Sequence, residues 1–121
     1  MKRNWDTIRK ILLAIEALPT LDSQLGSGEI AAIDNEECAY HMRILIESGL
    51  IVGSCREAIG PAFCFAHRLT WEGHEFLDSI RDESVWNKIK LSARKQGISL
   101  SLDLIKDLSK ILLQSLISTV V

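Results

Sequence analysis

The feature that most limits the fold is a capped amphipathic helix that runs directly into a hairpin. Asp34 followed by Glu37 has the spacing of a capping box at a helix start. The apolar stripe that follows stops at Gly49, the residue type that most often ends a helix. A strand, a turn and a returning strand are then predicted over residues 50–52, 53–61 and 62–69. The chain is therefore expected to combine helices with a small antiparallel sheet.

Side-chain alternation predicts how the returning strand is oriented. Successive side chains on a strand point to opposite faces. One face is expected to hold Phe63, Phe65, His67 and Leu69, and the other Cys64, Ala66 and Arg68. A further short strand is predicted over residues 29–33, before the capped helix.

Four more helices are predicted from spacing and from their end signals. The first covers residues 4–18, with Asn4 as its cap and Pro19 as its stop. The third begins after Thr70, and Gly73 within it suggests a close contact with a neighbouring element. The fourth covers residues 84–96 before Gly97, and the fifth begins near Ser101.

The order of these elements is that of a winged-helix domain, with an extended segment in place of its usual middle helix. We expect an α+β, mostly helical fold, because the 121 residues suffice for one domain with a core of its own. Residues 1–82 are predicted to form the winged-helix-like core. Residues 83–121 are predicted to form a C-terminal helical extension of the same domain.

Composition excludes several classes of protein. A formal charge of −2 gives no global attraction for nucleic acid or acidic membranes. The N-terminus lacks the apolar region of a signal peptide, and no run approaches the roughly 18 apolar residues of a membrane span. We therefore expect a soluble cytoplasmic protein. Three cysteines form an odd set, so we expect all of them to be reduced.

Two Cys-x-x-His pairs raise the hypothesis of a zinc site. Cys38 and His41 can converge on one helix face, but Cys64 and His67 fall on opposite faces of a strand. Burial of the cysteines as small apolar residues is the simpler interpretation, so we expect no metal.

No catalytic motif is recognisable in the sequence. His74 and Glu75 resemble the start of a zinc-protease motif, but the second histidine is replaced by Asp78. His74 and Asp78 are instead spaced to pair on one helix face. Nucleophile motifs and phosphate-binding glycine loops are missing too. We therefore expect a protein that is not an enzyme and needs no cofactor.

The second helix is negatively charged at its start, which argues against its binding in the major groove of DNA. A major-groove reader presents cations to phosphates, whereas this helix carries four acids as a candidate protein-binding set. They are Asp34, Glu36, Glu37 and Glu47. Basic residues gather elsewhere, as candidates for nucleic-acid binding: Lys2, Arg3, Arg9, Lys10, Lys88, Lys90, Arg94 and Lys95. We favour the interpretation of both clusters as solvated helix faces that balance the acidic segments.

The last helix carries a broad apolar stripe that something must cover. Its members are Leu104, Ile105, Leu108, Ile111, Leu112 and Leu116. Packing on the chain's own core and a two-fold dimer interface both remain open.

Three blocks of the sequence resemble domain-of-unknown-function family 2513. They are MKRNWDTIRKILLAIE (1–16), YHMRILIESGLI (40–51) and LTWEGHEFLDSIRD (69–82). The resemblance extends over nearly the whole chain. It implies an intact domain and a bacterial or prophage setting, but no activity and no functional residues.

Together these observations predict a macromolecular binding module that forms a homodimer. The resemblance suggests a phage or prophage accessory protein that inhibits or adapts a host protein through protein contacts. The alternative is a winged-helix DNA-binding transcriptional regulator that uses the basic clusters.

Overall fold

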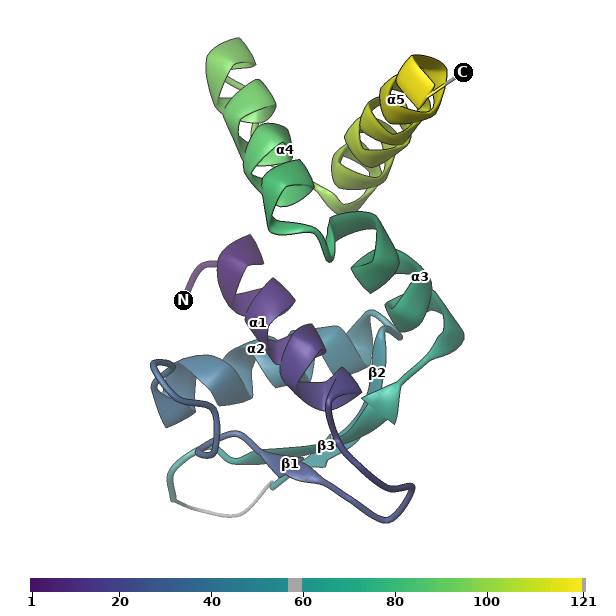
Figure 1. Ribbon diagram of the computed structural model, residues 1–121. Helices are drawn as coiled ribbons and strands as arrows, with labels where there is room; N and C mark the ends of the chain where they lie inside the picture. The colour runs from purple at the N-terminus through teal and green to yellow at the C-terminus, as the bar shows by residue number, and fades with distance from the viewer. Residues whose placement is uncertain (57–59, 121) are drawn as a thin grey trace. The chain divides into compact units, whose positions relative to one another are not determined.

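A computed structural model describes residues 1–56 and 60–120, with side chains described as far as residue 115 (Figure 1). Over these ranges the chain is α+β and mostly helical, as predicted. The elements in order are α1 (Trp5–Glu16), β1 (Leu25–Gly26), α2 (Asn35–Glu47), β2 (Ile51–Cys55), β3 (Cys64–Leu69), α3 (Trp71–Ile80), α4 (Glu83–Gln96) and α5 (Leu102–Val120).

The chain divides into two compact units, Met1–Glu75 and Phe76–Val121. The division lies within α3, a few residues before the boundary at 82 that the sequence suggested. In the first unit, β3 lies at the centre of an antiparallel sheet with the order β1-β3-β2. Helices α1 and α2 pack on each other and on this sheet. Their buried side chains include Ile11, Leu12 and Met42.

Side-chain caps fix the starts of the helices, as the sequence predicted. Asn4 Oδ1 accepts hydrogen bonds from the backbone N–H of Asp6 and Thr7 at 2.9 and 3.2 Å. Asp34 accepts one from Glu36 at 3.2 Å, and Thr70 Oγ1 accepts one from Gly73 N–H at 3.0 Å. Each cap satisfies N–H groups that have no partner within the helix.

The strand predicted over residues 29–33 is wrong. The first strand is Leu25–Gly26, which pairs with β3, and residues 29–33 form turns instead. Ser27 continues the pairing, because its N–H donates to Cys64 O at 2.9 Å. Ala32 has a φ of 68°, and this left-handed conformation is incompatible with an extended strand.

A β-bulge in β3 overturns the predicted alternation of its faces. Val52 lies opposite Arg68 while Gly53 lies opposite Ala66, so His67 is an extra residue in the ladder. Beyond the bulge the faces exchange: Leu69 is buried together with Cys64 and Ala66, and Arg68 is exposed. Phe63 and Phe65 remain half-buried, with ring centroids 4.9 Å apart. The second strand is also longer than predicted and extends to Cys55.

Two glycines are required by close backbone contacts. A Cβ atom on Gly53 would overlap the carbonyl oxygen of Phe65 at the bulge. A Cβ atom on Gly73 would overlap the carbonyl oxygen of Leu50. The close contact predicted for Gly73 is thereby confirmed.

We predict that Gly73→Ala destabilises the protein, although alanine usually favours a helix. The added methyl group must displace the backbone at Leu50, which should lower the free energy of unfolding by about 1–3 kcal/mol. Gly28→Ala is the control, because its Cβ would meet its nearest neighbour at 3.6 Å and should change stability by less than roughly 0.5 kcal/mol. Urea unfolding measures both. Equal stability of the two variants would contradict the contact.

The prediction that all three cysteines are reduced is wrong. Cys55 and Cys64 form a disulfide with an S–S distance of 2.01 Å and a Cα–Cα distance of 4.0 Å. The strand register explains the bond, because it sets these two residues directly opposite each other. Cys38 stays free and buried.

Reduction of this disulfide should lower the free energy of unfolding by about 2.5 kcal/mol, the entropy of closing a loop of this length. The buried Cys64 thiol of the reduced protein would have a hydrogen-bond acceptor, because its Sγ lies 3.4 Å from the carbonyl oxygen of Ala39. Urea unfolding with and without a thiol reductant tests this. The Cys55→Ser, Cys64→Ala double variant is the control and should not respond to reductant. An equal response of both proteins to the reductant would show that the change in stability does not come from the disulfide.

The second unit consists of the end of α3 with α4 and α5. Helices α4 and α5 diverge like the arms of a V from the end where they meet (Figure 1). Ser109 Oγ donates to Ser79 O at 2.8 Å and so ties α5 to α3. Trp86, Ile89 and Ile105 are buried. Among the described residues, no helix is long and apolar enough to span a bilayer.

Candidate functional site

One face of α2 is turned away from the core. Glu36, Tyr40, Arg43 and Glu47 recur at helical spacing, and we call them the α2 outer face. Glu36 and Glu47 are exposed, whereas Tyr40 and Arg43 are half-buried. The opposite side of the helix supplies core residues such as Met42.

A shallow apolar pocket of about 180 Å³ opens on this face. Ala39 and Tyr40 of α2 form one wall, and Met1, Ala62 and Cys64 form the rest. Glu36 and Arg43 supply its charged groups. Sequence reasoning missed this apolar pocket because its walls come from three separate segments.

The four predicted acidic residues divide between two roles. Glu36 and Glu47 are exposed to a partner. Asp34 is exposed as well but caps α2. Glu37 is half-buried and accepts a hydrogen bond from Thr7 Oγ1 of α1 at 3.4 Å. The available negative charge therefore comes from Asp34, Glu36 and Glu47, while Glu37 belongs to the packing between helices.

His41 is a structural residue. Its side chain is only 1% exposed. The backbone N–H of Asn4 donates to its Nε2 at 2.9 Å, so the proton lies on Nδ1, which is 2.8 Å from Glu37 O. Nε2 therefore ties the start of α1 to α2, while Nδ1 is bonded to a carbonyl group of α2 itself.

The free thiol of Cys38 is, like His41, buried, and its burial makes it unreactive. Loss of hydration, reinforced by the nearby charge of Glu37, raises the pKa of Cys38 from 9.0 to about 11. The thiolate is the form that attacks electrophiles and binds metals, so this thiol is suited to neither at neutral pH. Cys64, the other cysteine of the zinc hypothesis, is held in the disulfide. Within the described ranges, no three metal-ligating side chains are grouped.

The predicted basic residues lie in two separate units. Lys2, Arg3 and Lys10 are exposed in the first unit, and Arg9 is half-buried. The Arg3 guanidinium lies 4.4 Å from the centroid of the Trp5 ring.

The remaining basic candidates belong to α4. Lys88, Arg94 and Lys95 are exposed, and the half-buried Lys90 lies with its ammonium 5.6 Å from the Trp86 ring centroid. Neither basic cluster includes a residue of the α2 outer face.

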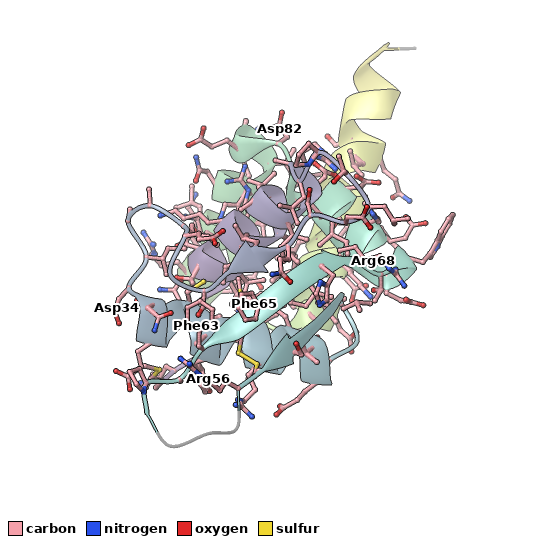
Figure 2. The ribbon with its side chains drawn as sticks, turned by 90° about the horizontal axis from the view of Figure 1, so that it is seen from below. Asp34, Arg56, Phe63, Phe65, Arg68 and Asp82 are labelled. Carbon is pink, nitrogen blue, oxygen red and sulfur yellow. A yellow bond between two sulfur atoms is a disulfide. The ribbon has the colours of Figure 1, made fainter. Side chains whose placement is uncertain are left out.

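The hairpin adds one cation beside an aromatic pair. The guanidinium of the exposed Arg56 lies 5.6 Å from the ring centroid of Phe63, which in turn contacts Phe65. Figure 2 shows Arg56 and Phe63 near the disulfide and Arg68 toward the opposite end of β3.

A second, larger cleft of about 300 Å³ lies at that opposite end of β3, and we call it the histidine cleft. It is lined by Glu16, His67, Arg68 and His74, together with the apolar side chains of Ile15, Leu18, Leu21 and Leu69 and the hydroxyl of Thr20. Nothing in the sequence required the two histidines to meet, because they belong to different elements. The fold brings both to one cleft with a carboxylate.

The apolar stripe of α5 is only partly uncovered. Ile105 is fully buried, and Leu104, Leu108 and Leu112 are half-buried. Ile111 is 61% exposed. Leu113, which was not part of the predicted stripe, is 45% exposed. Leu116 lies beyond the residues whose side chains are described.

Comparison with known proteins places this architecture in a family. The profile described as "Hypothetical protein (DUF2513)" matches residues 2–99. The chain belongs to this family, as the three sequence blocks suggested. An "Uncharacterized protein" of Haemophilus influenzae is 36% identical over 118 residues, which are 98% of this chain and 100% of that protein. No solved structure matches the chain.

Proposed function

We propose that the protein is a non-enzymatic binding module that recognises a protein partner through the α2 outer face and its apolar pocket. The observation that carries the proposal is the apolar pocket on α2. If this helix read DNA, the same face would have to be cationic. An aromatic side chain in a small pocket with charged groups around it is typical of a protein-binding hot spot.

The first unit supports a winged-helix-like architecture for this module. Its elements follow the order α1, β1, α2, β2, β3, and the sheet has the order β1-β3-β2. Residues 28–34 occupy the place of the usual middle helix. In this architecture α2 is the recognition helix and the β2–β3 hairpin is the wing.

The charges of α2 favour a protein over DNA. Glu36 and Asp34 stand in its exposed first turn and cap, where a helix reading the major groove would approach bases and phosphates. Bringing carboxylates to phosphates costs free energy that Arg43 alone cannot offset. A partner that inserts an apolar side chain between basic groups matches the same surface. In the bacterial or prophage setting, such a partner is a host protein that this chain inhibits or adapts.

Site-specific photo-crosslinking tests this surface. A photoreactive amino acid at position 40 should capture a partner protein from a native cell extract, whereas the same group at position 72 on α3 should not. Glu36→Lys together with Glu47→Lys should reduce the yield at position 40 about tenfold, the effect of roughly 1.4 kcal/mol. Equal yields at positions 40 and 72, or a yield unaffected by charge reversal, would contradict the proposal.

A gel-shift assay distinguishes the DNA-binding alternative. We expect no retardation of duplex DNA at low ionic strength. A regulator that uses the basic clusters would retard DNA, and its affinity would fall with salt by a log–log slope of about −0.9 for each phosphate contacted. Substitution of Lys2, Arg3 and Lys10 by glutamine would then make that slope less negative by about 3. Such a result would favour the DNA-binding regulator over the protein-binding module.

A further inference from the structure

We infer that the histidine cleft binds a small zwitterion of the α-amino acid class. The cleft lies wholly within the first unit, between the end of α1, β3 and α3. It shares no lining residue with the α2 outer face or its apolar pocket, so the inference is independent of the proposed protein-binding function.

The bulge in β3 is what builds this cleft. Consecutive residues on a regular strand point to opposite faces, so His67 and Arg68 would not both line one surface. The extra residue exchanges the faces, which brings both of them to the cleft and buries Leu69 in its floor. Bulges characteristically redirect side chains in this way beside functional sites.

Three residues of the lining can supply hydrogen-bond donors to an anionic group. The Arg68 guanidinium has five N–H groups, and only one is needed for its 3.2 Å hydrogen bond to Leu69 O. His67 and His74 add ring nitrogens from two different elements. A guanidinium with neighbouring donors is well matched to a planar carboxylate.

A fourth residue of the lining, Glu16, favours a positive charge. Glu16 is the last residue of α1, where the helix carbonyls carry a partial negative charge, and no basic residue occupies that last turn. A carboxylate accepts up to about four hydrogen bonds, so Glu16 can accept one from a ligand ammonium in addition to its contacts within the chain.

This arrangement of charges selects a zwitterion over a simple ion. An anion alone would meet the carboxylate of Glu16, and a cation alone would meet the guanidinium of Arg68. A ligand with both charges can pair with the Arg68 guanidinium and with the Glu16 carboxylate. Ile15, Leu18 and Leu69 form the apolar part of the lining and suit an aliphatic side chain. The volume of about 300 Å³ is at the lower end of the range for small-molecule sites.

Titration of the full chain with leucine, followed by amide NMR shifts, tests the inference. Leucine should shift the amide signals of His67, Arg68 and His74 in a saturable manner. N-acetyl-leucine lacks the ammonium and leucinol lacks the carboxylate. Each should bind about tenfold more weakly, which corresponds to about 1.4 kcal/mol.

Two variants assign the charges separately. Arg68→Gln should bind leucine and leucinol equally while still rejecting N-acetyl-leucine. Glu16→Gln should bind leucine and N-acetyl-leucine equally while still rejecting leucinol. Arg56→Gln, at an exposed arginine that lines neither cavity, is the control and should behave like the unchanged protein. Absence of saturable shifts up to the solubility of leucine, equal binding of the blocked analogues, or indifference to both cleft variants would overturn the inference.

Discussion

The pairing of β2 with β3, interrupted by one extra residue at His67, is the constraint on which most of the first unit depends. On one side of the bulge, the register sets Cys55 opposite Cys64 and turns Ala66 into the core. On the other side, it turns Leu69 inward and leaves Arg68 exposed. The approach of Gly53 to the Phe65 carbonyl leaves no room for a side chain there. A regular ladder would bury the guanidinium of Arg68, at a large cost in hydration.

This single strand also connects the two candidate surfaces. Cys64, at the start of β3, lines the apolar pocket beside α2, while His67, Arg68 and Leu69, at its end, line the histidine cleft. The strand lies between β1 and β2 and is therefore paired along both edges. A rigid central strand holds side chains for recognition more precisely than a loop does. Both surfaces thus use the strand that is paired along both edges, although their chemistry differs.

The sequence predicted those parts of the fold that depend on local interactions. The caps at Asn4, Asp34 and Thr70 bond to N–H groups two or three residues away, so a short window contains both partners. The close approach at Gly73 was also indicated, since a glycine inside a helix needs such a reason.

The parts that the sequence did not predict depend on partners distant in the chain. Strand β1 exists because Leu25 meets Ala66, and the disulfide exists because the hairpin register aligns its two cysteines. The bulge adds a residue that no alternation of apolar and polar types reveals. For the candidate sites, sequence reasoning found the acids of α2 but missed the apolar pocket among them. It likewise found His67 and His74 but could not bring them together with Glu16.

Burial then decides what each of the three histidines can do. His41 has both ring nitrogens bonded within the core, between Asn4 and Glu37, so no ligand can reach it. His67 and His74 are exposed and share a cleft with a carboxylate and a guanidinium. General acid–base catalysis would need one of these imidazoles held against a reacting atom by a second group. In the site inferred above, Glu16 and the Arg68 guanidinium instead supply complementary contacts for the two charged groups of one small molecule.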